Sequence, residues 1–156
     1  LEIDLLTRVQ LLRLIDHIME ALDIRDLSFR DLGALSGGQR QLVSIAQTLA
    51  REPDVIIMDE PTSALDLHRQ MEVLAFMRKQ AKQRGMIVMI AIHDLNQALR
   101  FADKTLIIAK GRMVACGLSG DIITADMLRD VYRVEARIER CSRDLSHVIV
   151  DGNLAV

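Results

Sequence analysis

The sequence is poor in aromatic residues, cysteine and proline, and it has no strong excess of either charge. Of its 156 residues three are Phe, one is Tyr and none is Trp, whereas half are hydrophobic. The core must therefore consist of Leu, Ile, Val, Met and Ala, which suits helices packed on a parallel sheet better than a β-sandwich. A net charge of -2 without a basic block gives no support for nucleic acid as a main partner.

Cysteine usage and hydrophobic runs limit the cellular setting. Cys116 and Cys141 form neither a CxxC pair nor a metal-ligand cluster, which favours a reducing, cytosolic compartment. No hydrophobic run approaches the length of a membrane span, and no signal-peptide pattern opens the sequence. The first residue is Leu1 and a helical pattern follows closely. We therefore expect the chain to be a piece of a longer protein.

Hydrophobic periodicity divides the sequence into helices and strands. Helices are expected over 8–22, 36–51, 66–84 and 124–132, with a short one after Asp94. The hydrophobic runs at 55–58 and 86–92 predict buried parallel strands, while 105–109 and 113–115 predict a hairpin turning at Lys110-Gly111. We expect an all-helical lobe at 1–51, an α/β layer at 52–133, and a tail at 134–156 that folds as a small hairpin.

A pair of glycines stands where the helix at 36–51 begins. Ser36 and Gln39 have the spacing of a capping box, which explains two positions of Ser36-Gly37-Gly38-Gln39. It does not explain Gly37 and Gly38, which are poor helix formers. Bare backbone N–H groups at a helix N-terminus favour an anion such as phosphate. Capping and phosphate binding are compatible at this motif.

Carboxylates and a histidine follow the two predicted buried strands. Asp59 and Glu60 end the first strand, where one side chain could face Mg²⁺ and the other an attacking water. His93 follows the second strand, at the same expected sheet edge, and could hold a γ-phosphate or the attacking water. Each feature has a simpler reading: a solvated turn before Pro61, a strand-end histidine without a catalytic role, and Asp66 as a helix N-cap.

The order of these motifs resembles one protein family. LSGGQRQ at 35–41, VIIMDEPTSALD at 55–66 and the histidine of MIAIHDLNQAL at 89–99 resemble parts of an ATP-binding cassette (ABC) transporter ATPase, namely its signature motif, Walker B strand, D-loop and H-loop. The resemblance covers nearly the whole chain. The run HDLNQALRFADKTLIIAKGRMVACG resembles the importer branch for iron–siderophore, haem or cobalamin uptake.

The resemblance implies an α/β, P-loop NTPase-like fold with a helical lobe and a mostly parallel sheet flanked by helices. It implies ATP and Mg²⁺ as ligands, Asp59 as the Mg²⁺ contact, Glu60 as general base and His93 as the γ-phosphate switch. Residues that would hold the γ-phosphate of a nucleotide bound by the opposite subunit are Ser36, Gly37, Gly38 and Gln39. Asp66 would signal between the two sites of a head-to-tail dimer.

The same resemblance implies the partners and the location. The ATPase subunit would pair with a second copy and grip transmembrane permease subunits through the lobe at 1–51. An extracytoplasmic solute-binding protein would be an indirect partner, and nucleic acid would not be one. The location would be cytoplasmic, on the inner face of the cell membrane.

The family's phosphate-binding motif is absent from the sequence. No G-x-x-x-x-G-K-[ST] occurs, so there is no Walker A strand and loop to bind ATP phosphates. We predict that this chain alone neither binds ATP tightly nor hydrolyses it. The family's sheet places the Walker A strand between the strands at 86–92 and 105–109. We expect two unpaired edges there, which association with another copy, strand exchange or rearrangement would cover.

Two other functions remain open from the sequence. The chain could be a non-catalytic module that docks on a permease or partner ATPase. It could also belong to a chromosome-maintenance or DNA-repair ATPase of the same class, although those carry long heptad coiled coils and none is present here.

Overall fold

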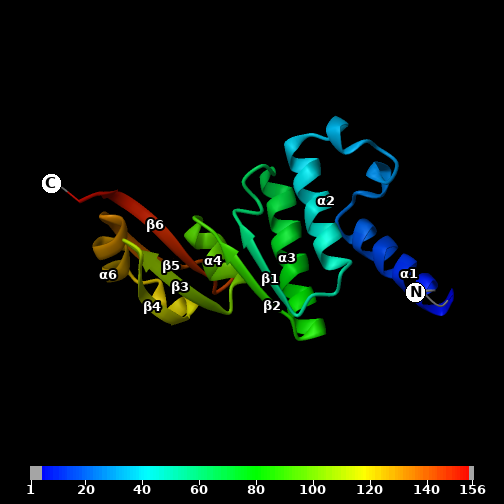
Figure 1. The fold of residues 1–156 in the computed structure, drawn as a ribbon. Coiled ribbons are helices and arrows are strands. Elements are labelled where there is room, and N and C mark those ends of the chain that lie inside the picture. The colour runs from blue at the N-terminus through cyan, green and yellow to red at the C-terminus, as the bar shows by residue number, and fades with distance from the viewer. Residues whose placement is uncertain (1–4, 155–156) are drawn as a thin grey trace. The chain divides into compact units, whose positions relative to one another are not determined.

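A computed structural model describes residues 5–154 and the side chains of 8–154. Contacts divide the chain into two units, residues 1–91 and 92–156. The first contains α1 (Leu5–Ala21), η1 (Arg25–Leu27), η2 (Leu32–Ala34), α2 (Gly37–Leu49), β1 (Val55–Asp59), α3 (Leu67–Arg84) and β2 (Ile87–Ala91). Its described residues before position 52 are helical or irregular (Figure 1).

The helix ends of the first unit follow local chemistry. Ser36 and Asp66 are the N-caps of α2 and α3, and each side-chain oxygen accepts a backbone N–H of the first turn. Gly85 ends α3 in the left-handed conformation, with φ at 67°. These three predicted boundaries are confirmed.

One hydrophobic core runs through the first unit. It joins the helical part to the strands, with Ile18 and Leu22 at one end, Leu42 and Leu49 in α2, and Ile56 in β1. Val73, Phe76 and Met77 of α3 complete it. The signature-like motif is therefore carried on a helix whose buried residues, Leu42, Ile45 and Leu49, belong to the same core as Ile56.

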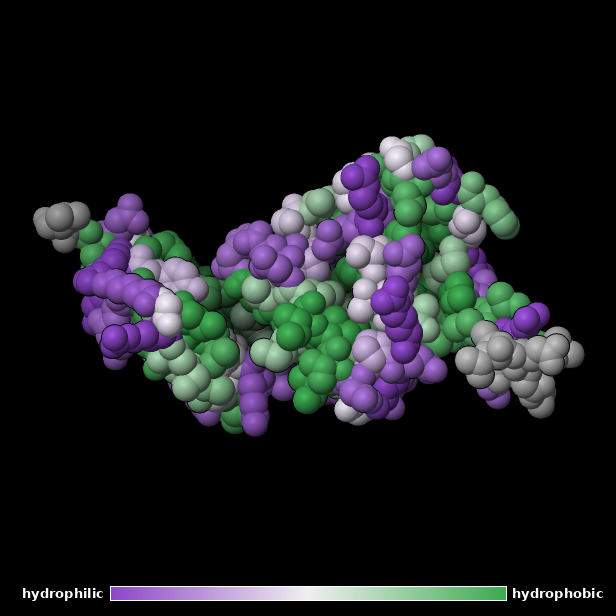
Figure 2. All heavy atoms as spheres, in the orientation of Figure 1, coloured by the Kyte–Doolittle hydropathy of each residue, from purple (hydrophilic) through white to green (hydrophobic). Residues whose placement is uncertain are grey.

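The prediction that the strands at 55–58 and 86–92 are fully buried is wrong. β1 and β2 pair in parallel, with Val55 beside Ile87 and Ile57 beside Met89. Ile56 is buried, but Ile57 is 76% exposed and Ile87 58% exposed. The reason is that α3 packs on one face, and within residues 5–91 nothing shields these side chains on the other. Figure 2 shows hydrophobic residues gathered where β1 and β2 lie in Figure 1.

The second unit is built from two antiparallel hairpins and short helices. It contains α4 (Leu95–Phe101), β3 (Lys104–Ala109), β4 (Arg112–Leu118), α5 (Ser119–Ile122), α6 (Ala125–Met127), a π-helical turn η3 (Leu128–Tyr132), β5 (Val134–Arg140) and β6 (Ser146–Asn153). Lys110 and Gly111 both have positive φ, which confirms the predicted hairpin turn. The predicted C-terminal hairpin is confirmed by β5 and β6. The helix α5 was not predicted.

The α/β class is confirmed, with its parallel part in the pair β1–β2. Within residues 5–154 the strands form three two-stranded sheets, so β2 pairs with β1 and β3 with β4. The expected association through unpaired edges stays a prediction, as does the division at residues 51 and 133. No helix in the described part of the chain is both long and hydrophobic enough to cross a membrane.

Candidate functional site

The predicted capping box is present at the start of α2. The Gln39 N–H donates to Ser36 Oγ at 3.2 Å, and the Ser36 N–H donates to Gln39 Oε1 at 3.0 Å. Both side chains therefore hold the first turn in place. Gly37 and Gly38 are the first two helical residues. Their N–H groups lie at the positive end of the helix dipole.

The two glycines differ in their surroundings. A Cβ added at Gly37 would lie 4.0 Å from Ala64 Cβ, an ordinary contact. A Cβ added at Gly38 would lie 2.8 Å from the backbone oxygen of Ala64 and 3.2 Å from Leu65 Cδ2. Gly38 is therefore required by the close approach of α2 to the turn before α3. From the sequence alone both glycines have the same explanation, because no local pattern shows this contact.

The turn after β1 has an unusual backbone conformation. Asp59 is the last residue of β1, in register with Ala91, and both carboxylates of Asp59 and Glu60 are exposed. Glu60 has φ at 42°, the left-handed region that costs a non-glycine residue about 1–3 kcal/mol. Its N–H donates to the Ala91 oxygen at 3.1 Å. The backbone oxygen of Glu60 accepts the Ser63 N–H at 3.2 Å and the Ser63 hydroxyl at 3.0 Å.

The start of α2 and the turn before α3 line one open cleft of about 840 Å³ within the first unit. We call it the signature cleft; it is lined by residues 23–27, 36–39, Leu42, 64–66 and Arg69. It brings together five of the predicted site residues, namely Ser36, Gly37, Gly38, Gln39 and Asp66. Asp59 and Glu60 do not line it.

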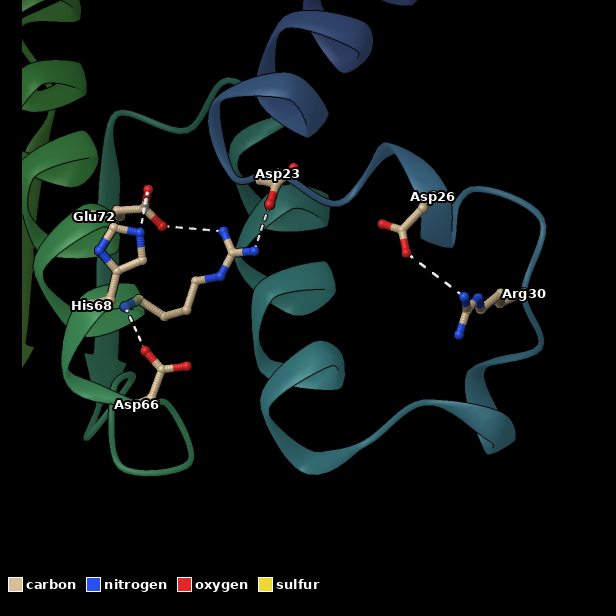
Figure 3. A network of polar contacts seen from close by, with 7 residues as sticks. Asp23, Asp26, Arg30, Asp66, His68 and Glu72 are labelled. Carbon is tan, nitrogen blue, oxygen red and sulfur yellow. Dashed lines mark hydrogen bonds and ion pairs between the residues drawn. The ribbon is translucent and has the colours of Figure 1, made fainter.

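Ionic contacts connect residues that line the signature cleft to each other and to their neighbours (Figure 3). The Arg69 guanidinium lies 2.5 Å from Asp23 Oδ2 and 3.1 Å from Glu72 Oε2. The hydrogen bond to Asp23 is the largest of the contributions that raise the pKa of Arg69. Sequence reasoning missed Asp23 and Arg69, because 46 positions separate them. The one available signal was that Arg69 lies in the first turn after Asp66.

His93 lies in the second unit, two residues beyond the end of β2. The following residue, Asp94, caps α4 by accepting the N–H groups of Asn96 and Gln97 at 2.9 and 3.1 Å. The short helix predicted after Asp94 is thereby confirmed, with Asp94 as its N-cap. The placement of His93 beside Asp59 and Glu60 stays a prediction.

Comparison with known proteins gives consistent matches. A family model described as ABC transporter matches residues 7–63. The chain is 36% identical over 126 residues to the iron(3+)-hydroxamate import ATP-binding protein FhuC of Bacillus subtilis, covering 81% of this chain and 47% of that one. It is also 36% identical over 152 residues to the hemin import ATP-binding protein HmuV of Bordetella pertussis, covering 92% and 56%.

A solved structure described as a metal-chelate type ABC transporter in an inward-facing conformation matches with a TM-score of 0.77 and 31% identity. It covers 88% of this chain and 56% of that chain. The chain thus spans about half the length of the relatives that it matches. The motifs, the fold and these matches agree, and the chain belongs to the ABC transporter family of ATP-binding proteins.

Proposed function

We propose that this chain is the part of an ABC importer ATPase that contains the signature motif and the Walker B strand. The observation that carries this proposal is the signature cleft, where the glycine-rich start of α2 and the turn ending at Asp66 face one open space. The relatives' names support an importer of iron–siderophore or haem type, and the sequence resemblance adds cobalamin. The whole protein would bind and hydrolyse ATP and so drive transport through a permease.

The first proposed role is to hold phosphate from across a dimer. The N–H groups of Gly37 and Gly38 and the Ser36 hydroxyl would bind the γ-phosphate of ATP bound mainly by a second copy of the subunit. Gln39 holds this turn through the capping box, and Asp66, on the same cleft, would link the two sites.

The second proposed role is at the end of β1. Asp59 offers a single exposed carboxylate, which fits a Mg²⁺ ion that keeps most of its ligands as water and phosphate. Glu60 would accept the proton of the attacking water, and the fixed backbone around it would direct its carboxylate. His93 would contact the γ-phosphate.

The proposed partners and location follow from importer function. The helical part at 1–51 would grip transmembrane permease subunits on the cytoplasmic face of the membrane. A solute-binding protein would act on the opposite face. The chain by itself would not hydrolyse ATP, because its sequence has no Walker A loop to bind the phosphates.

A fusion protein tests the proposal. An N-terminal half that contains a Walker A loop, taken from a FhuC relative, is joined in frame to this chain, and phosphate release is measured with Mg-ATP. We expect turnover that falls by about 100-fold or more in Glu60→Gln, since a general base contributes this much. Glu52→Gln is the matched control, because Glu52 is also exposed and also has positive φ.

The signature role has its own matched pair of variants in the same fusion. Ser36→Ala should lower turnover strongly, whereas Ser44→Ala, at an exposed position of the same helix, should not. Equal activity of Glu60→Gln and Glu52→Gln would overturn the catalytic proposal. A fusion that folds and binds a permease but never hydrolyses ATP would instead support the docking module.

A further inference from the structure

Asp23 has a backbone conformation that favours glycine. It follows α1 and has φ at 50°, which glycine adopts at no cost and which a residue with a side chain adopts less readily. Its side chain is 78% exposed, so packing in the core does not hold the carboxylate in place. What the carboxylate does contact is the Arg69 guanidinium at 2.5 Å.

Arg69 contacts three acidic residues of the first unit. Its side chain is 28% exposed, less than that of either acidic partner. One guanidinium nitrogen contacts Asp23 after α1, and another contacts Glu72 in α3, as the dashed lines from these two residues show (Figure 3). Its backbone N–H donates to Asp66 Oδ1 at 3.0 Å. The planar guanidinium can hold two carboxylates at fixed angles.

These contacts lie where they can set the shape of the signature cleft. Asp23, Asp66 and Arg69 all line it, together with the start of α2. The contact of Gly38 with the backbone of Ala64 connects the turn before Asp66 to α2. A displacement of Arg69 would therefore move the start of α3 and, through the turn at Ala64, the start of α2.

We propose that the Asp23–Arg69 ion pair sets the position of the α1 end against the α3 start, and that Arg69 is a positioning residue for the signature cleft. The functional meaning rests on the proposed function, in which this cleft holds a phosphate. In the absence of the pair, the cap hydrogen bonds that Gln39 and Arg69 donate at the two helix starts would still form but would break more often.

Hydrogen exchange of individual backbone amides, followed by NMR on the full 156-residue chain, tests this proposal. The variant is Asp23→Asn, which removes the charge and keeps a side chain that tolerates positive φ. We expect the amides of Gln39 and Arg69 to exchange roughly two- to fivefold faster, the range expected for a partly exposed ion pair. The amides of Ile45 and Phe76, in the middle of α2 and α3, should be unchanged.

Two comparisons make the result specific. Asp26→Asn is the control, because it removes the same charge from the neighbouring Asp26–Arg30 pair at 3.7 Å (Figure 3). It should leave Gln39 and Arg69 unchanged. Adding 1 M NaCl to the wild-type chain should increase exchange at Gln39 and Arg69 less than Asp23→Asn does, because the Debye length of about 3 Å still exceeds the 2.5 Å contact.

Three outcomes would overturn the proposal. They are unchanged exchange at Gln39 and Arg69 in Asp23→Asn, an equal increase at every amide of the first unit, and the same pattern in Asp26→Asn. The second outcome would mean a general loss of stability without positioning. The experiment contains no nucleotide, so its failure leaves the proposed ATPase function standing, whereas an inactive fusion protein would overturn that function alone.

Discussion

The two glycines of the signature motif should respond oppositely to the same substitution. Both begin α2, so replacing either by Ala brings a similar gain in helix propensity, up to about 1 kcal/mol. Comparing Gly37→Ala with Gly38→Ala therefore cancels most of this gain in helix propensity. What remains is the contact of the added methyl group.

The magnitude follows from the positions of the neighbouring atoms. At Gly38 the new Cβ would be 2.8 Å from the Ala64 oxygen, a backbone atom that cannot rotate away. Overpacking of this kind costs about 1–3 kcal/mol. At Gly37 the nearest neighbour, Ala64 Cβ, is 4.0 Å away and nothing has to move. Gly38→Ala should thus be less stable than Gly37→Ala by about 1–3 kcal/mol.

Urea unfolding followed by circular dichroism at 222 nm measures this difference, because the long helices α1, α2 and α3 all lie in the first unit. With a slope of about 1–3 kcal/mol per M, the midpoints should be separated by roughly 1 M. Equal midpoints for the two variants would refute the close approach of α2 to Ala64. A stabilised Gly38→Ala would refute it as well.

Two further predictions concern the second unit. The Asn96 side chain accepts the Val148 N–H at 2.8 Å and donates to the Val148 oxygen at 3.3 Å. Asn96→Ala should therefore destabilise this unit by about 1–3 kcal/mol, measured by Tyr132 fluorescence in urea, whereas Asn153→Ala at an exposed site should not. Equal effects of the two substitutions would contradict the link between Asn96 and Val148. Hydrogen bonds from backbone N–H groups, of which that of Arg143 has the largest effect, lower the pKa of the exposed Cys141 thiol. Its alkylation rate should therefore reach half its maximum at a lower pH than that of an ordinary thiol. A midpoint at or above about pH 8.5 would contradict this.

Local chemistry made much of the fold predictable. Ser36, Asp66 and Asp94 are caps whose partners lie within three residues, so the sequence contains the whole signal. Lys110-Gly111 likewise specifies its own turn. The motif spacing singled out five residues that line the signature cleft together, because each stands at a helix start that periodicity had located; they are Ser36, Gly37, Gly38, Gln39 and Asp66.

Non-local packing was not predictable. The hydrophobic runs of β1 and β2 indicate strands that could be covered on both faces, but the exposure of Ile57 and Ile87 depends on which helices are available to cover them. The close contact of Gly38 with Ala64 and the Asp23–Arg69 pair join segments far apart in sequence. No local pattern marks such contacts.

The measurement that tests the central claim most directly is calorimetric titration of Mg-ATP into the purified 156-residue chain, together with phosphate release. The chain has the glycine-rich helix start and the strand-end carboxylates but no Walker A loop. We therefore predict an ATP affinity weaker than about 1 mM, equivalent to roughly -4 kcal/mol, and no turnover. Micromolar affinity, or phosphate release that Glu60→Gln abolishes, would contradict the account.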